Sequence, residues 1–317
     1  MGVTRDGVSL TNLDQPLFDG SDSTKRDLVD YLDAVSEKIV PALRGRPLSV
    51  IRVLRGQKPF MQKNIPRYAP PWVRTVSQWA ESSRRQVSYA LCDDRRTLLW
   101  FANQRAVEYH PSLVRVDPGP HSVHLVLDLD PPEGDVFSAA VQAARLVRQV
   151  MSEAGLPSVV KTSGAKGLHV LAPVADGTAA ADLAAATRAI AARAERLDPA
   201  LATTAFIRED RGGRVFLDPT RSGSATLIAP YSPRVRPGTP VSFPVRWAEL
   251  DDIRPADFTV HTAPGLLGGT DPWAAEMPEP RELNANLVEE GHTIPVPRVQ
   301  AMHEGKRRAR ARRATGG

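Results

Sequence analysis

Residues 123–130 of the chain read VHLVLDLD, and this stretch decides how the middle of the sequence folds. Apolar Val and Leu residues alternate along it, which is typical of a β-strand. Side chains two residues apart lie on the same face of a strand. We therefore predict that Val123, Leu125, Leu127 and Leu129 face the core. The two acids at positions 128 and 130 then project together from the opposite face.

The segments on either side of this strand complete a recognisable order of elements. Apolar residues at helical spacing predict helices over residues 136–154 and 180–197. Short apolar runs predict strands at residues 158–162, 168–173 and 214–218. The resulting β-α-β-β-α-β order is the split βαβ arrangement, also found in RNA-recognition-type sheets. Many unrelated proteins share it, so the order predicts a fold and not a function.

The remaining segments give weaker patterns. We predict one helix over residues 23–43 and strands at residues 48–54, 87–91, 97–101, 225–229 and 241–245. After about residue 251 the chain is irregular and rich in proline. The predicted fold class is α+β, with a split βαβ sheet packed on an N-terminal mixed α/β module. The expected modules span about 1–115, 120–250 and 251–300, and a basic disordered tail follows at 301–317.

The composition is that of a soluble globular protein, with 42% hydrophobic and 24% charged residues among 317. No stretch approaches the roughly 20 apolar residues of a membrane span, and no signal peptide is evident at the N-terminus. Cys92 is the only cysteine, which excludes an internal disulfide. We therefore expect a cytoplasmic protein without membrane contact.

The formal net charge of +5 comes from the C-terminal tail. Residues 305–317 hold six of the 41 Lys and Arg residues and no acid, so the rest of the chain has 35 basic and 36 acidic residues. A tail of this kind adds non-specific affinity for phosphates. A solvated terminus without a dedicated role is an equally open interpretation, so the tail does not indicate catalysis.

A third acid, Asp218, ends the predicted strand at residues 214–218. In a split βαβ sheet the first and last strands can lie within reach of each other, which would bring Asp218 to Asp128 and Asp130. Carboxylate oxygens suit Mg²⁺ or Mn²⁺, and two such ions serve in-line phosphoryl transfer.

Two alternatives to this metal site stay open. The acid pair could simply end a strand before a Pro-Pro turn. It could also be the nucleophilic Asp-x-Asp of haloacid-dehalogenase-type phosphatases, which lie on a parallel sheet and usually carry Thr or Val where Pro132 stands.

Residues 161–170 read KTSGAKGLHV and form the second chemical signal. Two glycines permit a tight turn with exposed backbone N–H groups. Ser163 offers a hydroxyl, Lys166 a positive charge, and His169 a donor at the start of the return strand. Together they predict a cradle for a triphosphate. An ordinary polar hairpin is the alternative.

These motifs in this order resemble those of the archaeo-eukaryotic primases. In detail, the chain resembles the polymerase domain of bacterial ATP-dependent ligase D over roughly residues 8–250. It also resembles the stand-alone actinobacterial primase-polymerases associated with ligase C. Supporting stretches read LTN at residues 10–12, TK at 24–25, APPW at 69–72, VEYH at 107–110 and IAPYS at 228–232.

The resemblance implies roles for residues at matching positions. It implies that the metal ligands are Asp128, Asp130 and Asp218. It implies that the nucleotide contacts are Arg52, His110, Ser163, Lys166, His169, Arg221 and Arg234. It implies that the DNA contacts are Asn12, Lys25, Phe60 and Lys63, with Lys25 binding the 5′-phosphate of a downstream strand. The chain departs from the family pattern at three positions near these contacts, where it carries Gln15, Ile51 and Met61.

The resemblance also implies a function. We expect a monomeric, DNA-dependent nucleotidyltransferase that fills gaps or extends broken DNA ends in repair, within the nucleoid. Two Mn²⁺ (or Mg²⁺) ions and a nucleoside triphosphate, with ribonucleotides favoured, are the implied cofactors and substrate. Gapped or broken duplex with a 5′-phosphate, Ku and an ATP-dependent ligase are the implied partners. A non-catalytic module that binds DNA ends or gaps is the alternative.

Overall fold

The computed structural model describes residues 3–80, 84–116, 121–122, 124–134, 136–222, 225–267 and 271–296. The chain divides into two compact units. The first comprises Met1–His121, Val159–Lys166 and Ser224–Met277, and the second comprises Ser122–Ser158, Gly167–Gly223 and Pro278–Gly317. The basic tail, Val123 and Asp135 lie outside the described residues, and the division into three modules stays a prediction. None of the helices within those described ranges is long and apolar enough to cross a membrane.

The second unit is built on four strands in the order β13-β14-β10-β12. Their bounds are β10 (His124–Asp130), β12 (Leu168–Pro173), β13 (Ala202–Thr203) and β14 (Val215–Asp218). β10 pairs antiparallel with both β12 and β14, while β13 runs parallel to β14. Because β10 has antiparallel neighbours on both sides, the parallel-sheet phosphatase alternative is wrong.

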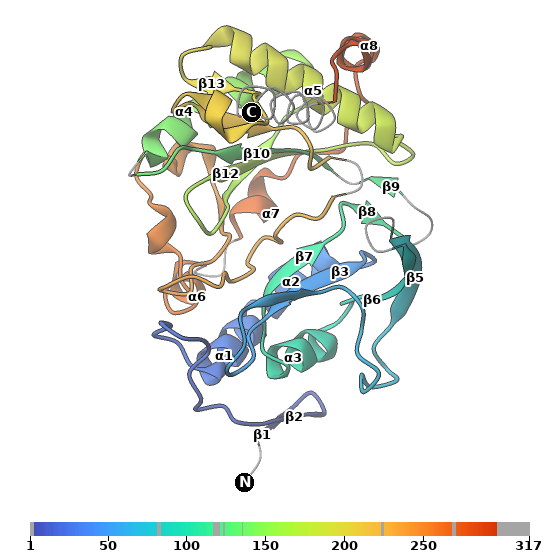
Figure 1. Ribbon diagram of the computed structural model, residues 1–317, viewed down its shortest axis with the longest axis vertical. Helices are drawn as coiled ribbons and strands as arrows, with labels where there is room; N and C mark the ends of the chain where they lie inside the picture. The colour runs from blue at the N-terminus through green and yellow to red at the C-terminus, as the bar shows by residue number, and fades with distance from the viewer. Residues whose placement is uncertain are drawn as a thin grey trace, which may run out of the picture. The chain divides into compact units, whose positions relative to one another are not determined.

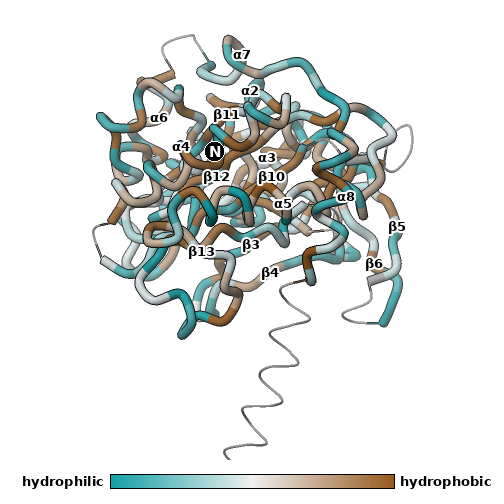
Figure 2. Tube along the Cα trace, turned by 90° about the horizontal axis from the view of Figure 1, so that it is seen from above, coloured by the Kyte–Doolittle hydropathy of each residue, from teal (hydrophilic) through white to brown (hydrophobic). Residues whose placement is uncertain are grey.

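Helices cover one face of this sheet. The helices of the unit are α4 (Phe137–Glu153), α5 (Ala180–Leu197) and α8 (Ala285–Thr293), and Figure 1 shows α4 and α5 lying over β10 and β12 with α8 beside α5. Hydrophobic residues run along β10 and β12 (Figure 2). Val126 is fully buried together with Leu125 and Leu127. The side chains on both faces of β10 are therefore buried, and not those on one face alone as the alternation of the sequence suggested.

The first unit is built on a five-stranded sheet. Its order is β4-β3-β6-β5, with β7 pairing β3. The strands of the unit are β1 (Val3–Arg5), β2 (Val8–Leu10), β3 (Leu48–Arg52), β4 (Phe60–Gln62), β5 (Thr75–Ala80), β6 (Arg85–Ala90), β7 (Ala106–Pro111), β8 (Val114–Arg115), β11 (Val159–Thr162) and β15 (Pro244–Val245), and β9 (His121–Ser122) lies at the junction of the units. The helices are α1 (Lys25–Ala34), α2 (Ser36–Leu43), α3 (Arg95–Asn103), α6 (Ala263–Leu266) and α7 (Pro272–Glu276).

The structure corrects several sequence-based predictions. The strand predicted at residues 97–101 is wrong, because these residues lie in α3, whose N-cap Asp94 accepts a hydrogen bond from Thr97 N at 2.7 Å. The single helix predicted over residues 23–43 is two helices that meet at Val35. Of the two late strands, only β15 forms, and residues 226 and 241 make isolated bridges. β5 and β7 were missed, whereas the bounds of β12 and α5 match the prediction.

We predict that Gly291→Ala destabilises the second unit. A Cβ at this position would lie 1.9 Å from the carbonyl oxygen of Ala185 in α5, because α8 approaches the alanine-rich helix closely there. The Gly291 carbonyl also accepts a hydrogen bond from Arg188 Nη2 at 3.0 Å. Overpacking of this kind lowers the free energy of unfolding by about 1–3 kcal/mol, which chemical denaturation will measure.

Gly265→Ala is the matched control. This glycine also lies in a helix, and a Cβ there would meet no atom within 4 Å. Alanine favours a helix over glycine by about 1 kcal/mol, so the control is expected to be neutral or stabilising. A Gly291→Ala protein as stable as this control would contradict the close packing of α8 on α5.

Candidate active site

Three carboxylates meet in the second unit at the ends of two paired strands. Asp128 and Asp130 end β10, and Asp218 ends β14. The antiparallel register places Asp128 directly opposite Asp218, which confirms the predicted juxtaposition. The chain after β14 is held beside β10 by Ser222, whose Oγ accepts from Val126 N at 2.9 Å and lies 3.2 Å from Val126 O.

Polar partners already engage two of these acids. Arg221 Nε lies 3.2 Å from Asp128 Oδ2 and 3.4 Å from Asp218 Oδ2. His169 Nε2 lies 3.2 Å from Asp128 Oδ1. The backbone N–H and the hydroxyl of Thr220 donate to Asp218 Oδ1 at 2.8 and 2.6 Å. One guanidinium therefore bridges the acids of both strands.

The pKa of the third acid, Asp130, reflects its burial and the charges around it. Burial, followed by the charge of Asp128, raises the pKa of Asp130 to about 6. Arg211 opposes this shift, and Asp218 adds to it. At Asp130, burial and the neighbouring carboxylates therefore outweigh the nearby arginines.

This donor set suits a hard divalent cation. Carboxylate oxygens are the ligands that Mg²⁺ and Mn²⁺ prefer. Burial and the charge of Asp128 raise the pKa of Asp130, and a nearby cation would favour its ionised form. Within the described ranges, however, no group of three or more His, Cys, Asp and Glu side chains has a metal-binding arrangement. The oxygens of Asp128 and Asp218 instead face Arg221, His169 and Thr220.

A glycine sets the distance between β10 and the turn that leads into β12. A Cβ on Gly167 would lie 2.2 Å from Leu129 O and 3.4 Å from Pro131 Cδ. Only glycine permits this approach without a shift of the backbone. The second glycine of the KTSGAKGLHV motif thus has a packing role in the second unit, next to the acid that ends β10.

The first part of the same motif belongs to the first unit. Arg234 Nη1 donates to Ser163 O at 2.7 Å. Gly164 has a φ of +69°, and a Cβ there would lie 2.6 Å from Arg234 Cγ. Ser163 Oγ accepts from Ala165 N at 3.2 Å. The turn predicted from the two glycines is confirmed, and Arg234 fixes its backbone.

A buried glutamate that sequence reasoning missed holds the neighbouring residues of the first unit. Glu108 Oε2 lies 2.9 Å from His110 Nε2, while Glu108 Oε1 lies 3.2 Å from Arg234 Nε and accepts from Val235 N at 2.9 Å. Burial opposes ionisation, but these three partners together lower the pKa of Glu108 to about 2. The signal was the spacing in VEYH, because strand alternation puts Glu108 and His110 on one face of β7.

The remaining predicted nucleotide and DNA contacts of the sheet have varied environments. Arg52 is buried, with Nε donating to Gln104 O at 2.8 Å and Nη1 to Gln62 Oε1 at 2.7 Å. Its guanidinium carbon lies 6.0 Å from the centre of the Phe60 ring. Lys63 is exposed just beyond β4. Arg52 therefore stabilises the sheet, and its role toward a nucleotide stays a prediction.

Lys25 is also buried. Its Nζ donates to Thr11 O at 2.6 Å and to Asn103 Oδ1 at 2.7 Å. Burial, followed by the charge of Arg105, lowers the pKa of Lys25 to about 8. Asn12 is exposed and has a φ of +53°. The roles of Lys25 and Asn12 toward DNA stay predictions.

Comparisons with known proteins agree with this arrangement. The family model described as LigD, primase-polymerase domain, matches residues 24–273. The multifunctional non-homologous end joining DNA repair protein LigD of Mycobacterium tuberculosis is 36% identical over 257 residues, which are 77% of this chain and 34% of that protein. The bifunctional non-homologous end joining protein LigD of Bacillus subtilis is 32% identical over 260 residues, 80% of this chain and 41% of that protein. The chain thus spans about a third to two fifths of these relatives.

A solved structure is similar over most of the chain. It is the polymerase domain from Mycobacterium tuberculosis ligase D in complex with DNA, with 34% sequence identity and a TM-score of 0.77. The match covers 85% of this chain and 97% of that chain. It confirms the predicted α+β primase-polymerase fold.

We predict that Asp130→Asn stabilises the metal-free protein at pH 7.5. Because the folded-state pKa of Asp130 lies above the ordinary value of 3.8, the folded protein binds this proton more tightly than the unfolded chain does. The carboxylate therefore destabilises the fold increasingly as pH rises from about 4 to about 6. Thermal unfolding in EDTA should show a gain of a few degrees at pH 7.5 and almost none below pH 4.

Asp252→Asn, at an exposed position of the first unit, serves as the control and should leave the melting temperature unchanged at both pH values. A gain for Asp130→Asn that is equally large below pH 4 would show that the gain does not come from the charge of the Asp130 carboxylate.

Proposed function

Because the chain belongs to the LigD primase-polymerase domain family, we propose that it is a template-dependent polymerase that fills gaps or extends broken DNA ends during repair. Membership makes it a nucleotidyltransferase of the polymerase type. The observation that carries the proposal is the register that sets Asp128 opposite Asp218, with Asp130 ending the same strand. Three acids at adjoining strand ends are what phosphoryl transfer with two metal ions requires.

We assign Asp128, Asp130 and Asp218 as the ligands of two divalent ions. The chemistry that such ions supply when bound is activation of the attacking 3′-hydroxyl and neutralisation of charge on the transferred phosphate. Arg221, which bridges Asp128 and Asp218, is suited to a phosphate by its planar fork of donors. It keeps the two acids close and neutralised until other positive charge arrives.

In the first unit we assign His110, Ser163, Lys166 and Arg234 to nucleotide binding. Glu108 supports this set, because one carboxylate holds both His110 and Arg234, and Arg234 in turn holds the Ser163 backbone. Groups that are fixed before substrate arrives lose little entropy on binding it. In the second unit we assign a nucleotide contact to His169, whose ring lies against Asp128. Arg52 is assigned only a supporting role.

We further propose Mn²⁺ as the metal, ribonucleotides as the favoured substrates, and gapped or broken duplex with a 5′-phosphate as the DNA. The names of the relatives, which are non-homologous end joining proteins, support Ku and an ATP-dependent ligase as partners. The DNA in the similar solved structure supports a DNA substrate. A monomer acting at the nucleoid in the cytoplasm completes the proposal.

A second candidate, a non-catalytic module that binds DNA ends or gaps, is favoured by one observation. The oxygens of Asp128 and Asp218 face Arg221, His169 and Thr220. A protein that binds gapped DNA and incorporates no nucleotide with any divalent metal would establish this second candidate.

We predict that Asp128→Ala and Asp218→Ala each abolish nucleotide addition. The loss should be at least about 10³-fold, equivalent to about 4 kcal/mol of transition-state stabilisation, because two strands must supply the ligands together. The assay is extension of a gapped primer–template with Mn²⁺ and ribonucleotides. Affinity for the same DNA, measured by fluorescence anisotropy, should change little.

Glu153→Ala, an exposed acid of α4 in the same unit, is the control and should extend the primer normally. Undiminished extension by either aspartate variant would overturn the assignment of the acid cluster.

We also predict that Glu108→Gln raises KM for the incoming nucleotide about tenfold, with a smaller change in kcat. The amide preserves shape but removes the charge that orients His110 and Arg234, and loss of a charge-assisted hydrogen bond is worth about 1.5–3 kcal/mol. Glu37→Gln, on the exposed face of α2, is the matched control. Unchanged KM in Glu108→Gln would remove this residue from nucleotide positioning.

A further inference from the structure

Lys161, which opens the KTSGAKGLHV motif, is a cation in the interior of the first unit. It lies in β11 and its side chain is completely buried, whereas Lys166 of the same motif is partly exposed. Lysine is almost never fully buried unless its ammonium is compensated, because a buried charge is costly. An apolar side chain would fill the same space without this cost, which indicates that the charge itself has a use.

The ammonium of Lys161 is directed at a serine that is completely buried as well. Lys161 Nζ donates to Ser242 Oγ at 2.5 Å, and Ser242 Oγ in turn donates to Thr162 O at 2.8 Å. An ammonium can only donate, so the serine oxygen must accept from it and its own proton is left for the carbonyl. A charged donor also strengthens the next hydrogen bond in such a chain. Lys161 therefore fixes the direction in which Ser242 donates.

This serine belongs to a segment that anchors the residue just before the glycine turn. Thr162 N donates to Phe243 O, and Phe243 N donates to Thr162 Oγ1, both at 2.9 Å. Thr162 Oγ1 also lies 3.2 Å from Val241 O, to which it donates. The nitrogen, the carbonyl oxygen and the hydroxyl of Thr162 are thus all bonded to residues 241–243.

The glycine turn packs directly on the same serine. A Cβ on Gly164 would lie 2.9 Å from Ser242 N and 2.6 Å from Arg234 Cγ. Arg234 Nη1 donates to Ser163 O at 2.7 Å. A shift of Ser242 would therefore displace both the turn and the arginine that holds it.

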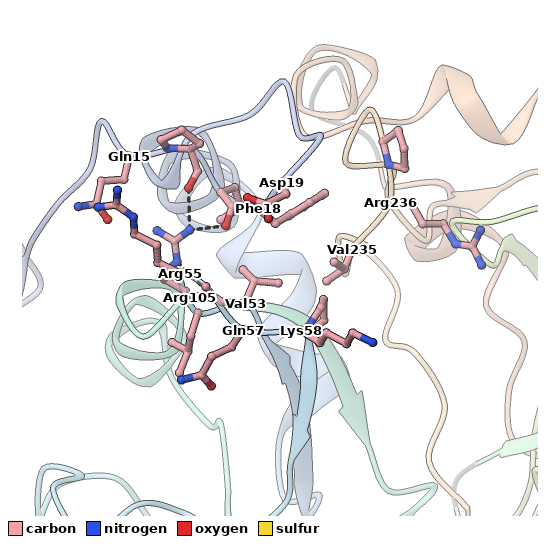
Figure 3. Close-up of a pocket in the computed structure, with 16 residues that line it drawn as sticks. Gln15, Phe18, Asp19, Val53, Arg55, Gln57, Lys58, Arg105, Val235 and Arg236 are labelled. Atoms are coloured by element: carbon pink, nitrogen blue, oxygen red, sulfur yellow. Dashed lines mark hydrogen bonds between the residues drawn. The ribbon is translucent and has the colours of Figure 1, made fainter.

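Ser242 also closes the loop that carries Arg234. Its backbone N donates to Ser232 O at 2.9 Å, and its carbonyl accepts from Tyr231 N at 2.7 Å, so these residues form the base of the loop. The outer residues of the loop, 235–237, line a pocket of about 810 Å³ (Figure 3). The pocket leaves the outer end open on one side, so the position of Arg234 depends on the base.

We propose that Lys161 is a positioning residue for nucleotide binding. Through Ser242 it fixes the turn that carries Ser163 and Lys166, together with the loop that carries Arg234. The identity of the ligand as an incoming nucleotide rests on the proposed function. Lys161 is completely buried and touches no substrate. Its charge orders these groups before the nucleotide arrives, so they lose little entropy on binding it.

The test uses Lys161→Met, which keeps the length of the side chain and removes its charge. We expect KM for the incoming nucleotide to rise about tenfold and kcat to fall less than about threefold, because binding groups that are misplaced lose affinity. Ser242→Ala is the second variant, which keeps the lysine and removes the hydroxyl to which it donates. It should raise KM in the same way. Melting temperatures will verify that each variant is folded.

Thr187→Ala is the matched control. Thr187 is also completely buried, and its Oγ1 donates to Leu183 O at 2.7 Å within α5 of the second unit. The control loses a buried hydroxyl of the same kind, so an effect of reduced stability alone will appear in it. The inference is overturned if Lys161→Met and Ser242→Ala both leave KM unchanged, or if the control raises KM equally.

A double variant determines whether the two residues act as one unit. If Lys161 acts through Ser242, Lys161→Met/Ser242→Ala should raise KM no more than the larger of the two single changes does, because residues of one network are not additive. Effects that multiply would show that Lys161 acts independently of Ser242, and would overturn the proposed route.

Binding of mant-ATP, with Mn²⁺ and without DNA, separates this outcome from that of the proposed function. A chain that extends no primer but binds mant-ATP more weakly in Lys161→Met would refute the polymerase and support the positioning role. A chain that extends primers and shows equal KM and equal mant-ATP affinity in that variant would do the reverse. A chain without affinity for mant-ATP would refute both.

Discussion

The pairing of β10 with β14 places two carboxylates opposite each other, and the chemistry assigned to the second unit depends on it. Like charges at this distance repel, so the register must be held by other forces. Buried leucines at 129 and 217 pair in the same ladder, and Ser222 ties the following residues to Val126. Apolar burial and one hydroxyl thus hold together an acid cluster that would otherwise drive the strands apart.

The two units differ in how far a buried carboxylate is compensated by neighbouring positive charges and hydrogen-bond donors. In the first unit, Glu108 is compensated by His110, Arg234 and a backbone N–H, which keeps it ionised and rigid. In the second unit, Asp130 is under-compensated and holds its proton more tightly. A compensated group positions its neighbours, whereas an under-compensated one favours a ligand of opposite charge. In the first unit, Lys25 donates to neutral oxygens of Thr11 and Asn103, and burial lowers its pKa.

The strand predicted at residues 97–101 failed because its short pattern had two physical solutions. Four of the five residues at 97–101 are apolar (LLWF at 98–101), and such a run suits a buried strand or a buried helix equally. The N-cap at Asp94 decided for the helix. Arg52 and Lys25 sit at the positions that the family resemblance indicated, yet both donate their hydrogen bonds inside the first unit. The sequence shows which cationic side chains are present, but not which of them are already hydrogen-bonded within the folded protein.

The sequence by itself determined the elements whose signals lie within a few residues: the strand that carries Asp128 and Asp130, the strand that carries Asp218, the glycine turn, and helix α5. These depend on local alternation, helical periodicity and backbone freedom at glycine. Only the tertiary structure decided the register of β10 against β14, the contact of Arg221 with Asp128, and the contacts of Glu108 with Arg234 and Val235. Those features join residues about 90 to 130 positions apart, and their energies depend on burial and distance, which no local pattern encodes.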